Sequence, residues 1–501
     1  MTKKHHIAFD DIVHSLEMNK EATAIIEKNG TSYSYHQLQQ MIVGAQEELL
    51  KKGVKKGDKI LVFVPMSVEL YALLEAIFSL GAIALFLDPW MKGKKMSQVI
   101  KQVQPDLFVV TKKISRIAWL LPATWNLKKW KIVSLNPSLN SWNITATTDD
   151  DNALITFTSG TSGQPKGANR TFGFLHAQSQ TLKHHIKGEN DEPYIDFTNF
   201  PIVGLADFAV GNTVVIPRLN LMKIHKADAS QIIQQLNENK VNRLIVSPSL
   251  LAKIIYNSDS TVLKHIKHVV TGGAPIPLQL IQHCLLHFPE IHFEAIYGST
   301  EAEPICITTF DEINEKLDNP LKGIYTGKKV EDIELKIIQT QSTPIKSNEF
   351  NSLQLQEHEI GEVVVTGDHV NKSYYQNQLA SEKNKIVDEE GTIWHRTGDL
   401  GYLTKEHLYL VGRDHRIIQA KGQDFHPYPI EQHIQLKFGI SDVGYVHHKN
   451  IITFFTGDKV DTEAVKNEII RVGYPCDAVI YYGKPLPRDA RHKSKLQIEA
   501  L

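Results

Sequence analysis

The sequence predicts an α/β fold, with a large N-terminal domain of parallel-sheet βαβ layers, a small β-subdomain and a small α+β C-terminal domain. Three observations support this class. Short apolar runs alternate with amphipathic stretches over most of the first 400 residues, residues 335–366 change to polar alternation, and residues 413–501 have the size of a small separate domain. A chain of 501 residues also exceeds the size at which one hydrophobic core keeps growing, so two or more domains are expected.

The first βαβ unit lies near the N-terminus. Lys59–Pro65 reads as a buried strand, Val68–Leu80 as the helix that follows it, and Ala82–Leu87 as the next strand. A strand, a helix and a strand in this order indicate a largely parallel sheet. The pattern recurs at residues 232–236, 244–246, 250–256 and 268–270.

Two later segments complete the predicted architecture. Residues 335–366 include the run Gly361–Val365 and resemble antiparallel β structure more than a parallel layer. After Gly412 the chain holds short strands and a helix at Asp461–Val472. We therefore expect an N-terminal domain of residues 1–412 and a C-terminal domain of residues 413–501.

Composition narrows the function. Lys and Arg number 55 against 56 Asp and Glu, so there is no basic excess of the kind that a nucleic-acid partner favours. The three cysteines, Cys284, Cys306 and Cys476, have neither disulfide-framework nor metal-ligand spacing, and are expected to be buried thiols.

The location is also predicted from sequence. The N-terminal residues lead into mixed polar sequence with no apolar signal region. The most apolar stretch, residues 60–87, is interrupted by Pro65, Glu69 and Glu75, and its charge-free part falls short of the ~20 residues that span a bilayer. No membrane span and a cytoplasmic location are therefore expected.

A loop rich in glycine and hydroxyl groups carries the chemistry. The strand-like run Leu154–Phe157 leads directly into it, and glycines, hydroxyls and one lysine together suit a polyanion. The spacing differs from that of the Walker loop, so this is a different phosphate loop. Its candidate binding residues are Thr158, Ser159, Gly160, Thr161, Ser162, Gly163 and Lys166.

This loop resembles the signature of the acyl-adenylate-forming (AMP-binding) superfamily, which contains acyl-CoA synthetases, peptide-synthetase adenylation domains and luciferases. Further segments similar to that family follow in its order: Gly272–Pro275, Tyr297–Glu301, Thr397–Asp399 and Gly412–Arg413. The resemblance covers nearly the whole chain. It implies an AMP-forming ligase that uses ATP and Mg²⁺ to activate a carboxylic acid as acyl-AMP with release of pyrophosphate.

The resemblance also assigns roles to residues. Tyr297 is expected to lie near adenine, Gly298 beside it to belong to the nucleotide site, Thr300 to meet the α-phosphate, and Asp399 and Arg413 to meet the ribose. Glu301 is expected to hold Mg²⁺ together with Thr158, and Gly273 and Ala274 are expected to line the adenine and acyl pockets. Physical chemistry agrees, because negative charge builds on the α-phosphate and fixed donors and cations aimed there lower the barrier.

The C-terminal domain is expected to supply one catalytic lysine and to move about a hinge that begins at Arg413. In the family, a lysine of the last loop enters the active site during adenylation. Alignment on Pro487 and Leu496 favours Lys495, with Lys493 as the competing register. Lys495, Thr300 and Glu301 are the candidate catalytic residues.

The acyl acceptor remains open between several branches. Residues 394–402, residues 297–304 and the ending Arg491–Lys495 look like β-lactone synthetases of bacterial olefin biosynthesis, in which the hydroxyl of a β-hydroxy acid attacks its own acyl-AMP. Gly204 stands where many acyl-CoA synthetases carry an aromatic residue or histidine. Lys421–Gly422, however, resembles the loop that serves thioester formation. We place transfer of a fatty acyl group to CoA first, and lactone formation, loading of a carrier protein and a non-catalytic relative after it.

Overall fold

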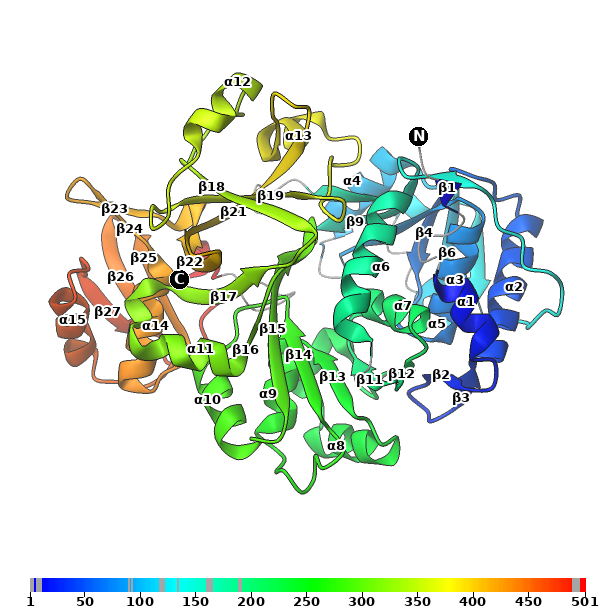
Figure 1. Cartoon of the computed structure of the whole chain (residues 1–501), viewed down its shortest axis with the longest axis horizontal. Coiled ribbons are helices and arrows are strands. Elements are labelled where there is room, and N and C mark those ends of the chain that lie inside the picture. The colour runs from blue at the N-terminus through cyan, green and yellow to red at the C-terminus, as the bar shows by residue number, and fades with distance from the viewer. Residues whose placement is uncertain are drawn as a thin grey trace. The chain divides into compact units, whose positions relative to one another are not determined.

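The computed structural model describes residues 4–5, 11–88, 91, 93–116, 122–132, 135–158, 165–187, 192–488 and 496–501. The chain divides into two compact units (Figure 1). The first unit comprises Met1–Ile245 and Asp368–Glu382, and the second comprises Val246–Gly367 and Lys383–Leu501.

The first unit contains a six-stranded sheet with the order β10-β9-β5-β4-β6-β7. All neighbours in it are parallel except β10, which runs antiparallel to β9. These strands are β4 (Lys59–Phe63), β5 (Ile83–Leu87), β6 (Leu107–Thr111), β7 (Lys129–Ile132), β9 (Asn152–Thr158) and β10 (Lys166–Thr171). The apolar side chains Leu61, Phe108 and Ile155 form part of one core with α4 (Gly93–Val103).

Helix α3 (Val68–Ser79) joins β4 to β5 and confirms the predicted βαβ unit. The helix begins where the Ser67 hydroxyl accepts a hydrogen bond from the Leu70 N–H, which satisfies one of the unpaired donors of the first turn. Its side chains are buried on nearly every side, and α2 (Tyr35–Lys51) packs against it. The mostly apolar sequence of α3 therefore reflects burial within a globular unit.

A second group of strands in the first unit has the order β13-β11-β12-β2-β3. The first four run parallel and β3 is antiparallel to β2. Their bounds are β2 (Thr23–Ile26), β3 (Ser32–Ser34), β11 (Ile195–Thr198), β12 (Thr213–Val215) and β13 (Arg243–Val246). The connecting helices of this unit are α1 (Asp11–Met18), α6 (Phe172–Ile186), α7 (Pro201–Ala209) and α8 (Ala229–Glu238).

An ion cluster is buried within these strands. Arg243 on β13 donates from Nε to Asp196 Oδ1 at 2.6 Å, and its Nη2 lies 3.4 Å from Asp207 Oδ1. All three side chains are inaccessible to solvent, and the guanidinium lies 3.9 Å from the Tyr194 ring centroid. Burial raises the pKa of Asp207 well above its ordinary value, and the neighbouring Asp196 adds to the rise. Sequence alone did not predict this cluster.

The second unit is built on strands in the order β18-β19-β21-β22-β17-β16-β15-β14. Only β14 and β15 are parallel, and the other neighbours are antiparallel. The pairing of Ile338 with Glu362 confirms the antiparallel structure predicted for residues 335–366. The bounds are β14 (His268–Gly272), β15 (His292–Ser299), β16 (Ala302–Thr309), β17 (Ile324–Lys329), β18 (Ile333–Ile338), β19 (Gly361–Gly367), β21 (Ile393–Thr404) and β22 (His407–Arg413), with β20 (Lys385–Val387) paired to β21.

Residues after Arg413 have a core of their own. Ile430, Tyr445 and Phe454 are buried in it, and α15 (Thr462–Arg471) begins at Asp461, whose side chain accepts hydrogen bonds from two N–H groups of the first turn. That cap confirms the predicted helix. The elements here are η8 (Asp414–Arg416), β23 (Ile418–Ala420), β24 (Gln423–Phe425), α14 (Pro427–Phe438), β25 (Val443–His448), β26 (Ile451–Thr456) and β27 (Ala478–Tyr481). The domain boundary at residues 412 and 413 stays a prediction.

Several shorter elements complete the two units. The helices are α5 (Lys112–Ser115), α9 (Pro248–Ile255), α10 (Leu278–His287), α11 (Phe310–Glu315), α12 (Ser347–Phe350) and α13 (Gln378–Asn384), and β1 (Lys4–His5) pairs with β8 (Thr147–Thr148). The three cysteines are buried, as predicted, and burial raises the pKa of Cys284 to about 12.

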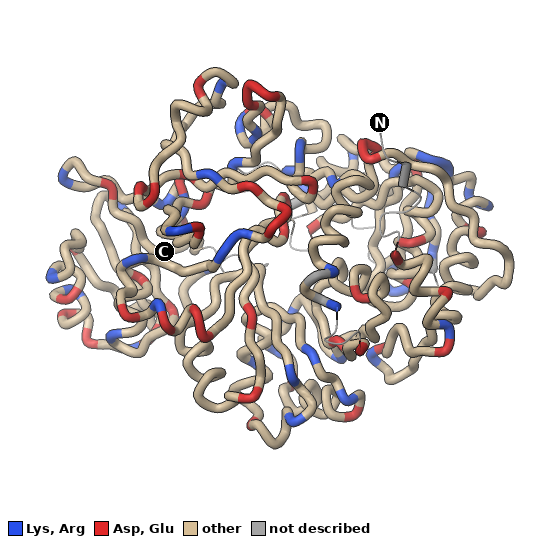
Figure 2. The backbone as a smooth tube through the Cα atoms, viewed as in Figure 1, with Lys and Arg blue, Asp and Glu red and all other residues tan. Residues whose placement is uncertain are grey.

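Charges of both signs lie along both units (Figure 2). This agrees with the near-cancellation of positive and negative residues in the sequence. In the part of the chain that the structure describes, no helix combines the length and the apolar character that crossing a bilayer requires.

Candidate functional site

The predicted phosphate loop lies in sequence between β9 and β10, which pair antiparallel. Thr158 on β9 pairs with Lys166 on β10, so the loop begins and ends on one rigid ladder. Gly167 lies against the Phe157 ring, where a Cβ atom would come within 2.8 Å of the ring carbons. A glycine is therefore required directly after Lys166. The predicted binding residues Ser159, Gly160, Thr161, Ser162 and Gly163, and the Thr158 side chain, lie outside what the structure describes.

Lys166 has a neighbour that sequence reasoning missed. Its Nζ lies 5.3 Å from the centroid of the Tyr374 ring, a distance at which a cation interacts favourably with an aromatic face. Tyr374 forms an antiparallel bridge with Ala168, and the Tyr375 N–H donates to the Gly167 carbonyl at 2.8 Å. Residues 374–375 thus support the strand that carries Lys166. Nothing in the local sequence around Tyr374 signals this contact across more than 200 residues.

Four predicted site residues directly follow the carboxyl ends of two strands. Gly273 and Ala274 follow β14, and Thr300 and Glu301 follow β15. Because these strands are parallel, their carboxyl ends meet at one edge of the sheet, which is where ligands bind in α/β proteins. Gly273 has a φ of 78°, and a Cβ on Gly272 would lie 2.6 Å from the Ile296 carbonyl oxygen. The two glycines therefore allow a close turn before Ala274.

The second of these strands leads into a tight turn. The chain returns close to Gly298, because a Cβ atom added at this residue would lie 2.9 Å from the Ala302 carbonyl oxygen. Thr300 and Glu301 form the turn between β15 and β16, and the Ser299 hydroxyl accepts from the Glu301 N–H at 3.3 Å. The turn thus carries two of the predicted site residues, Thr300 and Glu301, at this edge of the sheet.

Three further predicted residues are brought together around one carboxylate. Asp399 Oδ2 accepts a hydrogen bond from the Tyr297 hydroxyl at 2.8 Å, and Oδ1 lies 2.9 Å from Arg413 Nε. Asp399 and Arg413 are register partners on β21 and β22, while Tyr297 comes from β15. Gly398, with a φ of 71°, supplies the left-handed backbone conformation just before Asp399.

The electrostatics around Asp399 fix the protonation states of Tyr297 and Arg413. Loss of solvation raises the pKa of Tyr297 well above its ordinary value, and the Asp399 carboxylate adds to the rise. The same carboxylate is the main cause of the raised pKa of Arg413, and Tyr428 contributes further. Tyr297 therefore stays a neutral donor and Arg413 stays a cation across the physiological range.

The arrangement fits a diol. A carboxylate has about four acceptor directions, and Tyr297 and Arg413 use one on each oxygen of Asp399. The carboxylate is 9% exposed, so it is held in place and still has capacity for two more donors. Glu301 is a carboxylate of the kind that Mg²⁺ prefers.

The base of the predicted lysine loop is anchored. Arg488 and Leu496 form an antiparallel bridge, Arg488 Nη2 lies 3.0 Å from Asp442 Oδ1, and the Leu496 side chain packs against Gly444. Lys493 and Lys495 themselves lie between these anchors and outside the described residues, so the choice of register stays a prediction.

An α/β fold with mixed sheets and these motifs indicates an adenylate-forming enzyme, and comparison with known families agrees. The model of the family described as AMP-binding enzyme matches residues 12–375, so this chain belongs to that family. The predicted family is confirmed, and so is the activity class, an AMP-forming ligase that makes an acyl-adenylate.

Individual relatives differ in their acyl acceptors. The olefin beta-lactone synthetase of Stenotrophomonas maltophilia is 26% identical over 396 residues, which cover 74% of this chain and 70% of that protein. The 2-succinylbenzoate–CoA ligase of Oceanobacillus iheyensis is 25% identical over 436 residues, covering 85% and 84%. The structure of O-succinylbenzoate coenzyme A synthetase from Bacillus subtilis with ATP and magnesium ion has a TM-score of 0.80 at 19% identity and covers 100% of both chains, which confirms the fold class.

Proposed function

We propose that this protein activates a fatty acid as its acyl-AMP and then transfers the acyl group to CoA. The observation that carries the nucleotide part is the Asp399 carboxylate, which Tyr297 and Arg413 hold in one orientation with acceptor capacity left for a ribose. Fixing a carboxylate in advance reduces the entropy lost on binding. We further propose that the protein works in the cytoplasm, where both ATP and CoA are available.

The residues divide the adenylation step between binding and charge stabilisation. Asp399 accepts from the ribose hydroxyls and Tyr297 lies beside adenine. Lys166 binds phosphate, and Thr300 donates to the α-phosphate. Glu301 and Thr158 would hold Mg²⁺, which neutralises phosphate charge when bound. Lys495 places a positive charge where the pentavalent phosphate develops, so it acts on the transition state.

Acyl transfer is proposed to use a different orientation of the C-terminal part. Arg413 is held by Asp399, whereas Arg416 donates to Glu431 at 2.6 Å and to the Tyr445 carbonyl at 3.1 Å, within the C-terminal core. Asp414 and His415 are the residues left between the two anchors, which makes them the proposed hinge. Lys421 and Gly422 form the exposed turn between β23 and β24, and are proposed to serve the thioester step.

A second candidate acceptor is the substrate's own hydroxyl, which would give a β-lactone. Gly204 on α7 supports it, because a Cβ at that position would lie 2.3 Å from the Tyr71 hydroxyl oxygen. Tyr71 of α3 therefore occupies the space beside Gly204 where many CoA synthetases carry a side chain of their own. The likeness to olefin beta-lactone synthetases also supports this candidate. Loading of a carrier protein is the remaining alternative.

The test is acid-dependent ATP–pyrophosphate exchange with a panel of fatty, β-hydroxy fatty and aryl acids, each with and without Mg²⁺. Exchange with a fatty acid, followed by acyl-CoA formation when CoA is added, is the expected result. Loss of water from a β-hydroxy acid in the absence of CoA, measured by mass spectrometry, would identify lactone formation instead. If no acid supports exchange, the proposal is wrong.

A further inference from the structure

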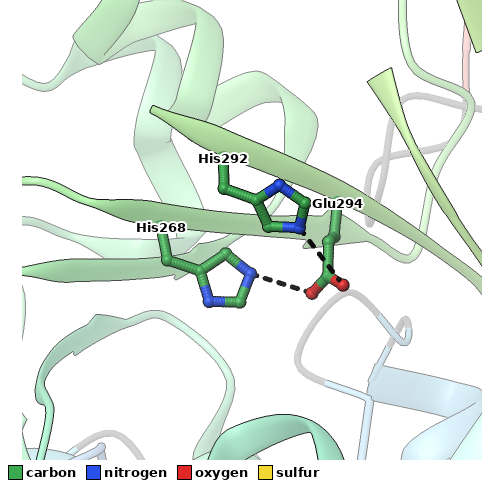
Figure 3. A group of neighbouring side chains, drawn as sticks. All are labelled: His268, His292 and Glu294. Carbon is green, nitrogen blue, oxygen red and sulfur yellow. Dashed lines mark hydrogen bonds and ion pairs between the residues drawn. The ribbon is translucent and has the colours of Figure 1, made fainter. Parts of the chain in front are cut away.

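Two histidines and one glutamate meet at the opposite ends of β14 and β15 from the site described above (Figure 3). His268 is the first residue of β14, His292 is the first residue of β15, and the two are register partners. Glu294 lies two residues further along β15, so its side chain points to the same face as that of His292. Strand register alone thus places three side chains with metal-binding atoms together.

The geometry of the three side chains is compact. Glu294 bridges the histidines, with Oε2 2.8 Å from His268 Nε2 and Oε1 3.6 Å from His292 Nε2. One ligand atom from each residue can be chosen so that all lie within 4.8 Å of one another. The imidazole rings are 5.2 Å apart between centroids and tilted by 43°.

We propose that His268, His292 and Glu294 form a binding site for a divalent transition metal ion of the zinc class. Zinc binds imidazole nitrogen and carboxylate oxygen at about 2.0–2.2 Å, with ligand atoms about 3.3 Å apart in a tetrahedral site. The His268–Glu294 pair is already within that separation. The three ligand atoms lie within 4.8 Å of one another, so movements of up to about 1.5 Å complete the site. Water takes the fourth position.

The exposure of the three residues suits this role. The side chains of His268 and Glu294 are only 13% and 19% exposed and are held by their mutual contact. His292 is 53% exposed, so its ring can turn toward the ion and the ion can enter from solvent. Two ligands are therefore preorganised, and only the third must be ordered on binding.

This site is distinct from the proposed magnesium site at Glu301. Glu301 follows the carboxyl end of β15, whereas His292 begins that strand, and nine residues of largely extended chain separate them by more than about 20 Å. The ligand types differ as well. Two imidazoles and one carboxylate favour zinc or cobalt, while Mg²⁺ prefers oxygen ligands.

A second histidine pair, on α10, offers a control. His283 and His287 lie one turn apart on α10 with ring centroids 4.3 Å apart. They supply two ligands, one fewer than the proposed site. His287 is exposed, so His287→Ala should fold normally and serve as a histidine deletion outside the cluster.

The experiment uses the full chain, treated with EDTA, dialysed and kept free of nucleotide. Zn²⁺ is titrated by calorimetry against a competing chelator, and Co²⁺ is followed by its visible absorption. One Zn²⁺ per chain is expected. His292→Ala and Glu294→Gln should each lower the Zn²⁺ affinity at least about tenfold and remove the visible absorption band of four-coordinate Co²⁺. His287→Ala should change neither the Zn²⁺ affinity nor the Co²⁺ band.

Equal Zn²⁺ affinity in the wild type and in His292→Ala would overturn the proposal, as would loss of the site in His287→Ala. Thermal melting of each variant without metal separates lost binding from lost folding. ATP–pyrophosphate exchange with Mg²⁺ is measured in parallel, because the metal site and the adenylation activity stand or fall separately. A metal-binding protein without exchange would refute only the proposed function.

Discussion

Asp399 and Arg413 face each other in register on β21 and β22, with the carboxylate Oδ1 2.9 Å from the guanidinium Nε. This ion pair belongs at once to the predicted ribose site and to the last strand before the C-terminal core. Three residues later, Arg416 is bound to Glu431. The carboxylate proposed to bind the ribose is therefore separated from the C-terminal core by a very short connection. The residues at both ends of this connection can be tested by substitution.

The carboxylate should dominate ribose binding. Asp399→Ala is expected to raise the KM for ATP by about tenfold to hundredfold, because hydrogen bonds to a charged group contribute about 1.5–3 kcal/mol. Tyr297→Phe removes one of the two groups that orient the carboxylate and should cause a smaller rise. ATP–pyrophosphate exchange as a function of ATP concentration measures both. A larger effect in Tyr297→Phe than in Asp399→Ala would contradict the assignment.

The hinge should be needed for transfer more than for adenylation. His415 donates its backbone N–H to Asp414 Oδ1 at 2.6 Å, and His415→Pro removes that donor and restricts φ to about −65°. Pyrophosphate exchange should stay within about twofold of wild type while acyl transfer slows at least about tenfold. His415→Ala, which keeps the N–H, is the control. Equal loss in the two half-reactions of His415→Pro would argue against two conformations.

Lys495 should act on the adenylation transition state. Lys495→Ala is expected to lower the forward kcat about 100-fold or more with little change in the KM for ATP. Transfer from supplied acyl-AMP should remain nearly intact. Lys493→Ala should be mild; if it is instead the severe variant, the register is two residues off, and if neither matters, the catalytic assignment is wrong. Single-turnover assays of each half-reaction measure these effects.

A buried carboxyl on α3 should make stability depend on pH. Burial raises the pKa of Glu75 from 4.5 to about 8, and among the described residues neither carboxyl oxygen has a hydrogen-bond partner. The folded protein therefore holds a proton that the unfolded chain releases above about pH 4.5. The stability that this bound proton contributes is fully present below about pH 4.5. Between about pH 4.5 and about pH 8 the free energy of unfolding falls by about 1.4 kcal/mol per pH unit.

Glu75→Gln should remove this dependence. The difference in free energy of unfolding between Glu75→Gln and the wild type, from urea denaturation at several pH values, should grow as the pH rises from about 5 to about 8. Glu69 lies partly exposed on the same helix, so Glu69→Gln is the control. Its difference in free energy of unfolding from the wild type should not change with pH. If the difference in free energy of unfolding between Glu75→Gln and the wild type does not change with pH, Glu75 is ionised in the folded protein.

The buried ion cluster of the first unit should be sensitive to loss of its cation. Arg243→Ala leaves Asp196 and Asp207 buried without their partner and should cost about 3–5 kcal/mol of stability. Arg218 pairs with Glu238 near the surface, so Arg218→Ala should cost at most about 1 kcal/mol. Thermal and urea unfolding of the two variants provide the comparison, and equal losses would be inconsistent with a critical buried cluster.

The sequence by itself determined the features that are local. The helix between β4 and β5, the strand before the phosphate loop and the cap at Asp461 follow from apolar period and end signals within a few residues. The order of the family motifs determined the family and the identity of the residues around Asp399.

Only the tertiary structure decided the features that join distant parts of the chain. Tyr374 comes to Lys166, His268 to Glu294, and Arg243 to two aspartates, through sheet register and packing that no local period encodes. The burial of Glu75 also could not be predicted from the local sequence. It interrupts an apolar run and reads as a break in it, yet the helices packed around it bury it, because a side chain's solvation depends on what folds against it.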